Sequence, residues 1–385
     1  MPSDALPVPS RFTAWTAARR AGGFTLVEIL IALVLGLLVV GALGQLYVGG
    51  RVVNRVIETS ATMNEEGRFA MEFFARDIRL AGHFSCGGAK AKLANAVDGQ
   101  TFWTILRGLD GYDGGEPSSI AAETLPSVFF DWGWPSPLPG RDILVLRYAD
   151  LRRSMPVTTG DFELGNDRFR FDTTHPFAEG QILILNDASC VQTSVFQAVH
   201  AYNNDNDHSV SYDPDATTAS PGNCTGHLAG EYDCTDPDRT FKERDPLDSF
   251  VNAELAPLTV RAFFVANQPT NQCTPTAEHC AAIANCPTLY VAGNDVPGAV
   301  PVLPDVTDLE LTYGIDDDIE RDQPGSGDAD VDAYLRADQV RAGDLWHQVL
   351  SVRLHLELTN ADCRTVEFDL TTALRNSATG ALLSY

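Results

Sequence analysis

Apolar and polar positions divide the chain into a long N-terminal helical zone and a strand-rich remainder. Residues 29–50 carry no charged side chain. Twenty-two such residues, at about 1.5 Å each in a helix, span about 33 Å, which is enough to cross the core of a bilayer. From Val53 to Ala81 apolar or small residues then recur at every third or fourth position, and the other face carries many charged residues. This pattern predicts an amphipathic helix that continues from the apolar stretch and ends near Gly82.

After residue 84 short alternating runs replace the helical period, and they predict mainly strands. In residues 349–358 polar and apolar positions alternate, as in a strand with one buried face. Residues 201–250 are rich in Asp, Asn, Pro and Gly, residues 316–345 are rich in Asp, and both stretches predict long loops. The clearest predicted strands are residues 141–149, 181–186, 191–199, 258–266, 306–313, 348–358 and 364–371.

The net charge also divides the chain in two, close to residue 82 where the helical pattern ends. The chain has 385 residues with 27 basic and 52 acidic side chains, a net charge of −25. Residues 1–82 are close to neutral, with 8 basic and 7 acidic side chains, so almost all of the negative charge lies in residues 83–385. Such an acidic body argues against direct binding of nucleic acid.

The cysteines indicate where this acidic body is located. All eight follow the apolar stretch, and an even set in an exported body predicts up to four disulfides in an oxidising compartment. We therefore expect a cytoplasmic N-terminus, a single span of the inner membrane and a periplasmic head. A cleaved secretory signal is the alternative, but its apolar region is normally about 7–15 residues long. Eight cysteines allow 105 connectivities, among which Cys224–Cys234 is the favoured local pair.

The junction before the apolar stretch reads Gly22-Gly23-Phe24-Thr25-Leu26-Val27-Glu28. A carboxylate at the start of a membrane helix is costly and marks a functional position. The motif resembles the class III signal of type IV pilins and type II secretion pseudopilins. The resemblance implies that a prepilin peptidase cuts between Gly23 and Phe24 and N-methylates Phe24. It also implies that Glu28 pairs with the N-terminal ammonium of a neighbouring subunit. The 23-residue leader is long for this family and puts the start codon in question.

Six further blocks resemble PilW-type minor pilins, in the order of that family. The resemblance implies a non-catalytic subunit that primes assembly of a type IV pilus and later sits at its tip. The implied partners are other minor pilins, the major pilin, a PilY-type tip adhesin, the prepilin peptidase, the inner-membrane assembly platform and membrane lipid. Cys86 and Cys190 fall within the blocks and form an implied pair, whereas Cys273, Cys280, Cys286 and Cys363 cannot be ordered. The blocks are residues 67–86, 142–149, 187–197, 306–316, 346–354 and 368–376.

The expected fold is a pilin-like α+β fold, in which a long N-terminal helix packs on an antiparallel sheet with disulfide-bearing loops. The expected segments are a leader (1–23), the membrane half of the helix (24–50), its amphipathic half (51–84) and the head (85–385). A pseudopilin of the GspJ kind is the first alternative. A membrane-tethered binding or hydrolytic ectodomain is the second, although the sequence has no G-x-S-x-G, H-E-x-x-H or phosphate-loop motif.

Two further stretches carry candidate chemistry. Asp328, Asp330 and Asp332 alternate like the first ligands of a calcium loop. The run departs from an EF-hand at Ala333 and Gln339, so calcium is a weak candidate and no other cofactor is expected. The aromatic run at residues 129–135 predicts either core packing or a partner-binding loop.

Overall fold

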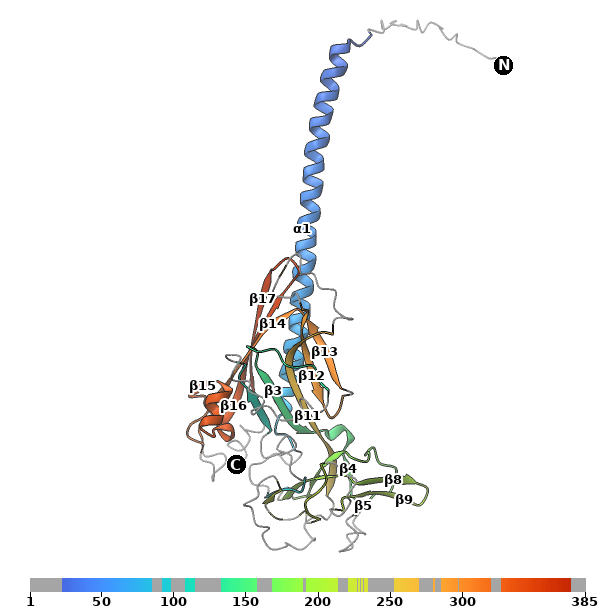
Figure 1. Cartoon of the computed structure of the whole chain (residues 1–385), viewed down its shortest axis with the longest axis vertical. Helices are drawn as coiled ribbons and strands as arrows, with labels where there is room; N and C mark the ends of the chain where they lie inside the picture. Colours follow the sequence, from blue (N-terminus) through green and yellow to red (C-terminus); the bar gives the residue numbers. More distant parts are fainter. Residues whose placement is uncertain are drawn as a thin grey trace, which may run out of the picture. The chain divides into compact units, whose positions relative to one another are not determined.

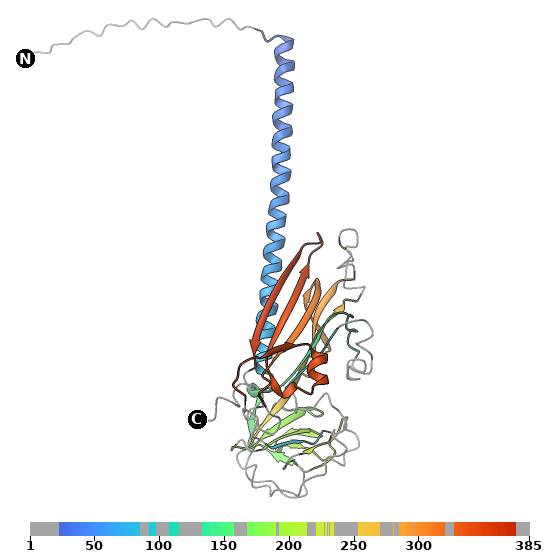
Figure 2. The ribbon, with the colours of Figure 1, turned by 90° about the vertical axis from the view of Figure 1, so that its left-hand side faces the viewer.

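The computed structural model of the chain describes residues 23–84, 92–97, 108–114, 133–157, 168–189, 192–213, 221–226, 228, 230, 232–234, 253–269, 280, 285–296, 298–319 and 327–374. It comprises two units, residues 1–60 and residues 61–385, and helix α1 (Leu26–Leu80) passes from the first into the second. The expected fold class is confirmed: a long N-terminal apolar helix precedes sheets that are mostly antiparallel (Figures 1 and 2).

In the first unit, every described side chain from Leu26 to Arg55 is exposed. The helix is long and apolar enough in this part to cross a membrane. Soluble proteins do not leave a continuous apolar surface of this kind in water, so the exposure is explained by a lipid or protein environment.

In the second unit, the rest of α1 forms one wall of the main core. Its buried residues include Met63, Gly67, Ala70, Phe74 and Ile78, which belong to the stripe that the sequence predicts. The helix ends before Gly82, whose φ of 72° is the left-handed conformation that glycine adopts most readily. Compared with the expected helical segments 24–50 and 51–84, the helix begins two residues later and ends four residues earlier.

Strand β11 organises the largest sheet because it pairs with β6 and β4 near its start, with β3 along its middle and with β12 near its end. Most pairs in this sheet are antiparallel, but β1 pairs in parallel with both β7 and β10. The ten strands among the described residues are β1 (Lys92–Asn95), β2 (Leu109–Tyr112), β3 (Ile143–Ala149), β4 (Met155–Pro156), β6 (Ile182–Asn186), β7 (Gln192–Gln197), β10 (Tyr232–Asp233), β11 (Glu254–Asn267), β12 (Pro287–Gly293) and β13 (Ala299–Pro304).

A second sheet has the strand order β15-β14-β16-β17, and a third has the order β5-β9-β8 (Figure 1). The second contains β14 (Val306–Ile315), β15 (Ala333–Leu335), β16 (Val349–Thr359) and β17 (Thr365–Ala373). The third contains β5 (Arg168–Arg170), β8 (His200–Asn204) and β9 (Asp207–Ser211). The short helical elements are η2 (Leu151–Arg153), α3 (Ala337–Ala342) and η5 (Trp346–Gln348).

Three apolar cores hold these layers together. The first joins α1 to β3, β11 and β12 and also to β14 and β16, so the end of α1 packs against both larger sheets. The second lies on the other face of β3, β11 and β12. The third fills the region around β5–β7 and β9 and is rich in phenylalanine.

The structure corrects the two long loops that the sequence predicts. Strands β8, β9 and β10 lie within or overlap 201–250, and β15 and α3 lie within 316–345. These elements are short and polar, so their burial pattern is too weak to outweigh the turn-forming composition around them. The predicted alternation is present from Val352 onward in β16, where Arg353 is exposed and His355 and Glu357 are half-buried between buried leucines. Val349 and Ser351, expected on the same face as Arg353, are buried.

Candidate functional site

The segment from Gly23 to Glu28 forms a reciprocal cap at the start of α1. The backbone N–H and the hydroxyl of Thr25 donate to Oε2 of Glu28, at 2.9 and 3.1 Å. The N–H of Glu28 donates in return to Oγ1 of Thr25, at 3.2 Å. This is a capping box, with Thr25 as N-cap and Glu28 three residues later. The docking role expected for Glu28 does not include this cap, although the pattern T-x-x-E was its signal in the sequence.

Nothing within the described chain crowds this junction. Phe24 is 83% exposed, and a Cβ added at Gly23 would meet no atom within 4 Å. The same open space surrounds the five glycines of the apolar part of α1, which are Gly36, Gly41, Gly44, Gly49 and Gly50. The described fold of the chain itself therefore gives no steric reason for glycine at any of these positions.

The other end of α1 is attached to the head through a buried ion-pair network. Asp77 is 1% exposed, and its Oδ2 accepts a hydrogen bond from Nη1 of Arg261 on β11 at 2.6 Å. Arg261 also binds Asp295 at 2.5 Å. Burial raises the pKa of Asp77, and the charge of Arg261 opposes that shift. The sequence analysis does not identify Asp77, because one acidic residue on an amphipathic helix is normally solvated.

Two disulfides connect parts of the described head. Cys224 and Cys234, the favoured local pair, are bonded with their Cα atoms 6.1 Å apart. Cys280 is bonded to Cys363, with 5.2 Å between the Cα atoms and 83 residues between them in sequence. The second bond ties the segment before β12 to the turn between β16 and β17. The sequence analysis could not order this pair.

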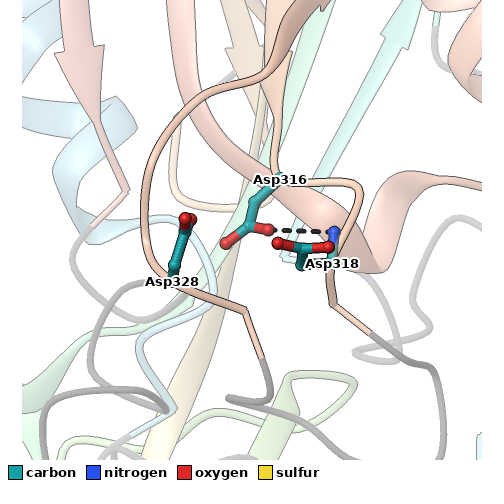
Figure 3. A group of neighbouring side chains, drawn as sticks. All are labelled: Asp316, Asp318 and Asp328. Carbon is teal, nitrogen blue, oxygen red and sulfur yellow. Dashed lines mark hydrogen bonds between the residues drawn. The ribbon is translucent and has the colours of Figure 1, made fainter.

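Three carboxylates converge beside the end of β14 (Figure 3). Ligand oxygens of Asp316, Asp318 and Asp328 all lie within 4.8 Å of one another. Asp316 is fully buried and accepts backbone N–H groups from Asp318 at 3.1 Å and from Ala329 at 3.0 Å. Asp318 and Asp328 are exposed. Carboxylate oxygens in this arrangement are suitable ligands for a hard cation such as Ca²⁺.

This cluster differs from the alternating run that the sequence singles out. Of the three residues in that run, Asp328 joins the cluster. Asp330 donates its N–H to Asp328 at 3.0 Å, and Asp332 accepts the N–H of Asp317 at 3.0 Å. The hydrogen bond and charge of Asp332 raise the pKa of Asp317. Periodicity could not predict the cluster, since Asp316 is 12 residues from Asp328 in sequence.

Several residues singled out from the sequence lie outside the described residues, namely Cys86, Cys190 and Cys273. Most of the aromatic run 129–135 does as well. Its described part includes Trp134, which is 7% exposed and stacks on Phe264 of β11 with ring centroids 6.4 Å apart. Trp134 therefore packs in the second apolar core.

Comparison with known proteins finds two matching families, one near the N-terminus and one in the C-terminal third of the chain. Residues 18–44 match the family described as the prokaryotic N-terminal methylation motif. Residues 262–379 match the family described as type IV pilus-assembly protein W. The latter range includes the resembling blocks at 306–316, 346–354 and 368–376, whereas the three earlier blocks lie outside both matches.

No curated protein and no solved structure matches the chain. The resemblance found in the sequence is confirmed by the two family matches, which cover the processing junction and, in the head, the end of β11 and strands β12–β17. The chain therefore carries a PilW-type region of type IV pilus-assembly proteins in residues 262–379 and the N-terminal methylation motif of prepilins in residues 18–44.

Proposed function

We propose that this protein is a minor pilin that helps to prime assembly of a type IV pilus and then occupies the tip of the filament. The observation that carries the proposal is the junction itself: Gly23-Phe24 lies directly ahead of α1, Glu28 lies in its first turn, and the first 30 residues of this helix are exposed and mostly apolar. In this role the head catalyses no reaction. It presents surfaces to partners, and the helix inserts first into the membrane and then into the filament.

Processing is supported by the accessibility of the junction. Gly23 and Phe24 precede the helix, and a peptidase needs an extended and uncrowded substrate backbone around the bond that it cuts. Cleavage between them would produce the N-methylated Phe24 terminus and a chain of 362 residues. In this arrangement the N-terminus faces the cytoplasm and the disulfide-bearing head is periplasmic.

Docking into the filament is supported by the carboxylate of Glu28 and by the glycines in the apolar part of α1. A carboxylate in lipid needs a partner; in the single chain Thr25 supplies one, and in an assembled filament the ammonium of a neighbouring Phe24 would supply a stronger one. Glycines with open space let neighbouring helices approach closely. The expected neighbours are other minor pilins and the major pilin, with the assembly platform below and a PilY-type adhesin above.

The mass of the N-terminal peptide from native membranes tests this proposal first. We expect a chain that begins at N-methylated Phe24. A chain that still begins at Met1 would show an unprocessed tethered ectodomain, and cleavage within residues 40–50 would show a secreted protein. Either result would contradict the proposal.

The variant Glu28→Gln separates docking from processing. Glutamine keeps an oxygen that can accept the Thr25 N–H, but it removes the charge that would pair with an ammonium. We expect normal cleavage and methylation, with loss of the protein from sheared pili and fewer pili per cell. Glu72→Gln, an exposed change on the same helix, is the matched control. Recovery of Glu28→Gln in pili at the unmodified level would refute docking through this residue.

A type II secretion pseudopilin of the GspJ kind would show the same processing. The match to the PilW family favours the pilus. Deletion followed by separate assays of piliation and protein secretion distinguishes the two, and we expect loss of piliation with secretion unchanged.

A further inference from the structure

His175 lies outside every feature used above, in the segment between β5 and β6. It is 5% exposed, and its ring lies against those of Phe171 and Phe177, with centroids 5.0 and 5.5 Å away. Nε2 is 3.0 Å from the carbonyl oxygen of Tyr202 and 3.2 Å from that of Ser209. Nδ1 accepts the backbone N–H of Phe177 at 3.3 Å. Carbonyls only accept, so Nε2 carries the proton and the ring is neutral.

These contacts hold one particular element, the hairpin of β8 and β9. Tyr202 and Ser209 lie directly opposite each other in that hairpin, so the single Nε2–H binds both strands. The backbone of His175 adds two bonds to the same place: its N–H donates to Oδ1 of Asn203 at 3.0 Å, and its carbonyl accepts from Nδ2 of Asn203 at 2.8 Å. His175 therefore fastens the hairpin to the segment Phe171–Phe177.

A second proton on His175 has no acceptor in this arrangement. The only site for it is Nδ1, which already faces the N–H of Phe177, so protonation would remove that bond and bury a cation. Burial and the neighbouring His208 lower the pKa of His175. The charged and titratable groups on the described elements around it are Arg168 and Arg170 on β5, Asp172 and Glu179 on its own segment, His200 and Tyr202 on β8, Asp205 in the β8–β9 turn, and Asp207 and His208 on β9.

Within the described structure none of these carboxylates forms a hydrogen bond or ion pair with His175. Asp207 pairs with Arg168 at 3.1 Å, and Glu179 lies 3.6 Å from His200. His208 carries a buried Nδ1 that makes no hydrogen bond among the described residues. Protonation of His208 would add a second positive charge and oppose that of His175.

We infer that His175 is an acid-sensitive latch, which holds the β8–β9 hairpin while neutral and releases it when protonated. Because the folded-state pKa is lowered, the stabilisation is complete above the ordinary value near 6.5 and is lost as the pH falls below it. Each unit of lowering corresponds to about a tenfold change in the closing equilibrium. The latch concerns the exported head alone, so its failure would leave the assembly proposal intact.

Hydrogen–deuterium exchange of the full chain in detergent, at pH 7.5 and pH 5.0 and corrected for intrinsic rates, tests this inference. We expect the protection of residues 200–211 to be lower at pH 5.0 than at pH 7.5, while β16 keeps its protection. His175→Gln, which cannot be protonated, should abolish the pH response. His200→Gln, a histidine of the same hairpin outside the latch, should retain it. Equal protection at both pH values, or a response that survives in His175→Gln, would overturn the inference.

A second measurement covers the case in which His175→Gln opens the hairpin at every pH. ¹⁵N-histidine spectra of the unmodified full chain report the tautomer and charge of His175 directly. We expect the Nε2–H tautomer at pH 7.5 and protonation that coincides with loss of hairpin protection. A His175 that becomes protonated while the hairpin stays closed would refute the latch.

Discussion

Arg261 is the residue on which the attachment of α1 to the head depends most directly, because one guanidinium binds both Asp77 and Asp295. Removing one partner of a buried pair leaves an uncompensated charge, which typically costs about 3–5 kcal/mol. We expect Arg261→Met to destabilise the protein by about this amount in denaturant unfolding at pH 8. The double variant Asp77→Asn/Arg261→Met should recover much of the loss.

The way in which the destabilisation by Arg261→Met changes with pH tests the role of Asp77. Burial already raises the pKa of Asp77, and loss of Arg261 raises it further. A carboxyl with a raised folded-state pKa takes up a proton on folding, so the variant should gain stability relative to the unmodified protein as the pH falls. A deficit that stays the same from pH 8 to pH 5 would contradict the assigned role of Asp77.

Asp142, the residue before β3, is a second carboxylate that links segments distant in sequence. It accepts the N–H of Gly114 and of Leu311 at 2.7 Å each. Burial raises its pKa from 3.8 to about 6, so the folded state should gain stability as the pH falls through about 6. Asp142→Asn removes this gain and turns an acceptor into a donor that faces an N–H, at a cost of about 1–3 kcal/mol. Unfolding between pH 7.5 and pH 5 measures both effects, and an unchanged pH slope would refute the assignment.

At the scale of elements, α1 and β17 meet where a glycine leaves room for a ring. A Cβ added at Gly67 would lie 2.2 Å from Cζ of Phe368. Alanine is the better helix former by about 1 kcal/mol, but overpacking costs about 1–3 kcal/mol. We expect Gly67→Ala to destabilise the protein and Phe368→Leu to relieve the clash. Gly50→Ala, with open space around it, is the control and should be neutral or stabilising; equal effects at both glycines would contradict this packing.

The same scale shows what the sequence could predict. Apolar periodicity located α1 and strands such as β3, β11 and β16, because each buries a regular stripe or a whole apolar run. It missed β12 and β13, where Pro and Gly interrupt the pattern, and the polar hairpin β8–β9, whose burial comes from neighbours such as His175. The junction at Gly23–Glu28 was predictable because it is contiguous in sequence. The Asp316 cluster and the Asp77–Arg261 pair were not, because folding brings distant residues together.

At the scale of the whole molecule, the acidic head combines several sheets with disulfides, which are typical of oxidising compartments. In a chain-entropy estimate the stabilisation grows with the enclosed loop, from about 2.7 kcal/mol for 10 residues to about 4.6 kcal/mol for 83. Those are the sequence separations of Cys224–Cys234 and Cys280–Cys363. We expect Cys280→Ser/Cys363→Ser to lose more stability than Cys224→Ser/Cys234→Ser in denaturant unfolding of the full chain.

The longer loop also joins β12 to the β16–β17 hairpin, and both contribute to the core that holds α1. Its loss should therefore increase hydrogen exchange at residues 63–78 of α1, which the Cys224–Cys234 variant should leave unchanged. The reverse order of the two variants would show that strain or residual structure, rather than loop closure, sets the contribution of these bonds.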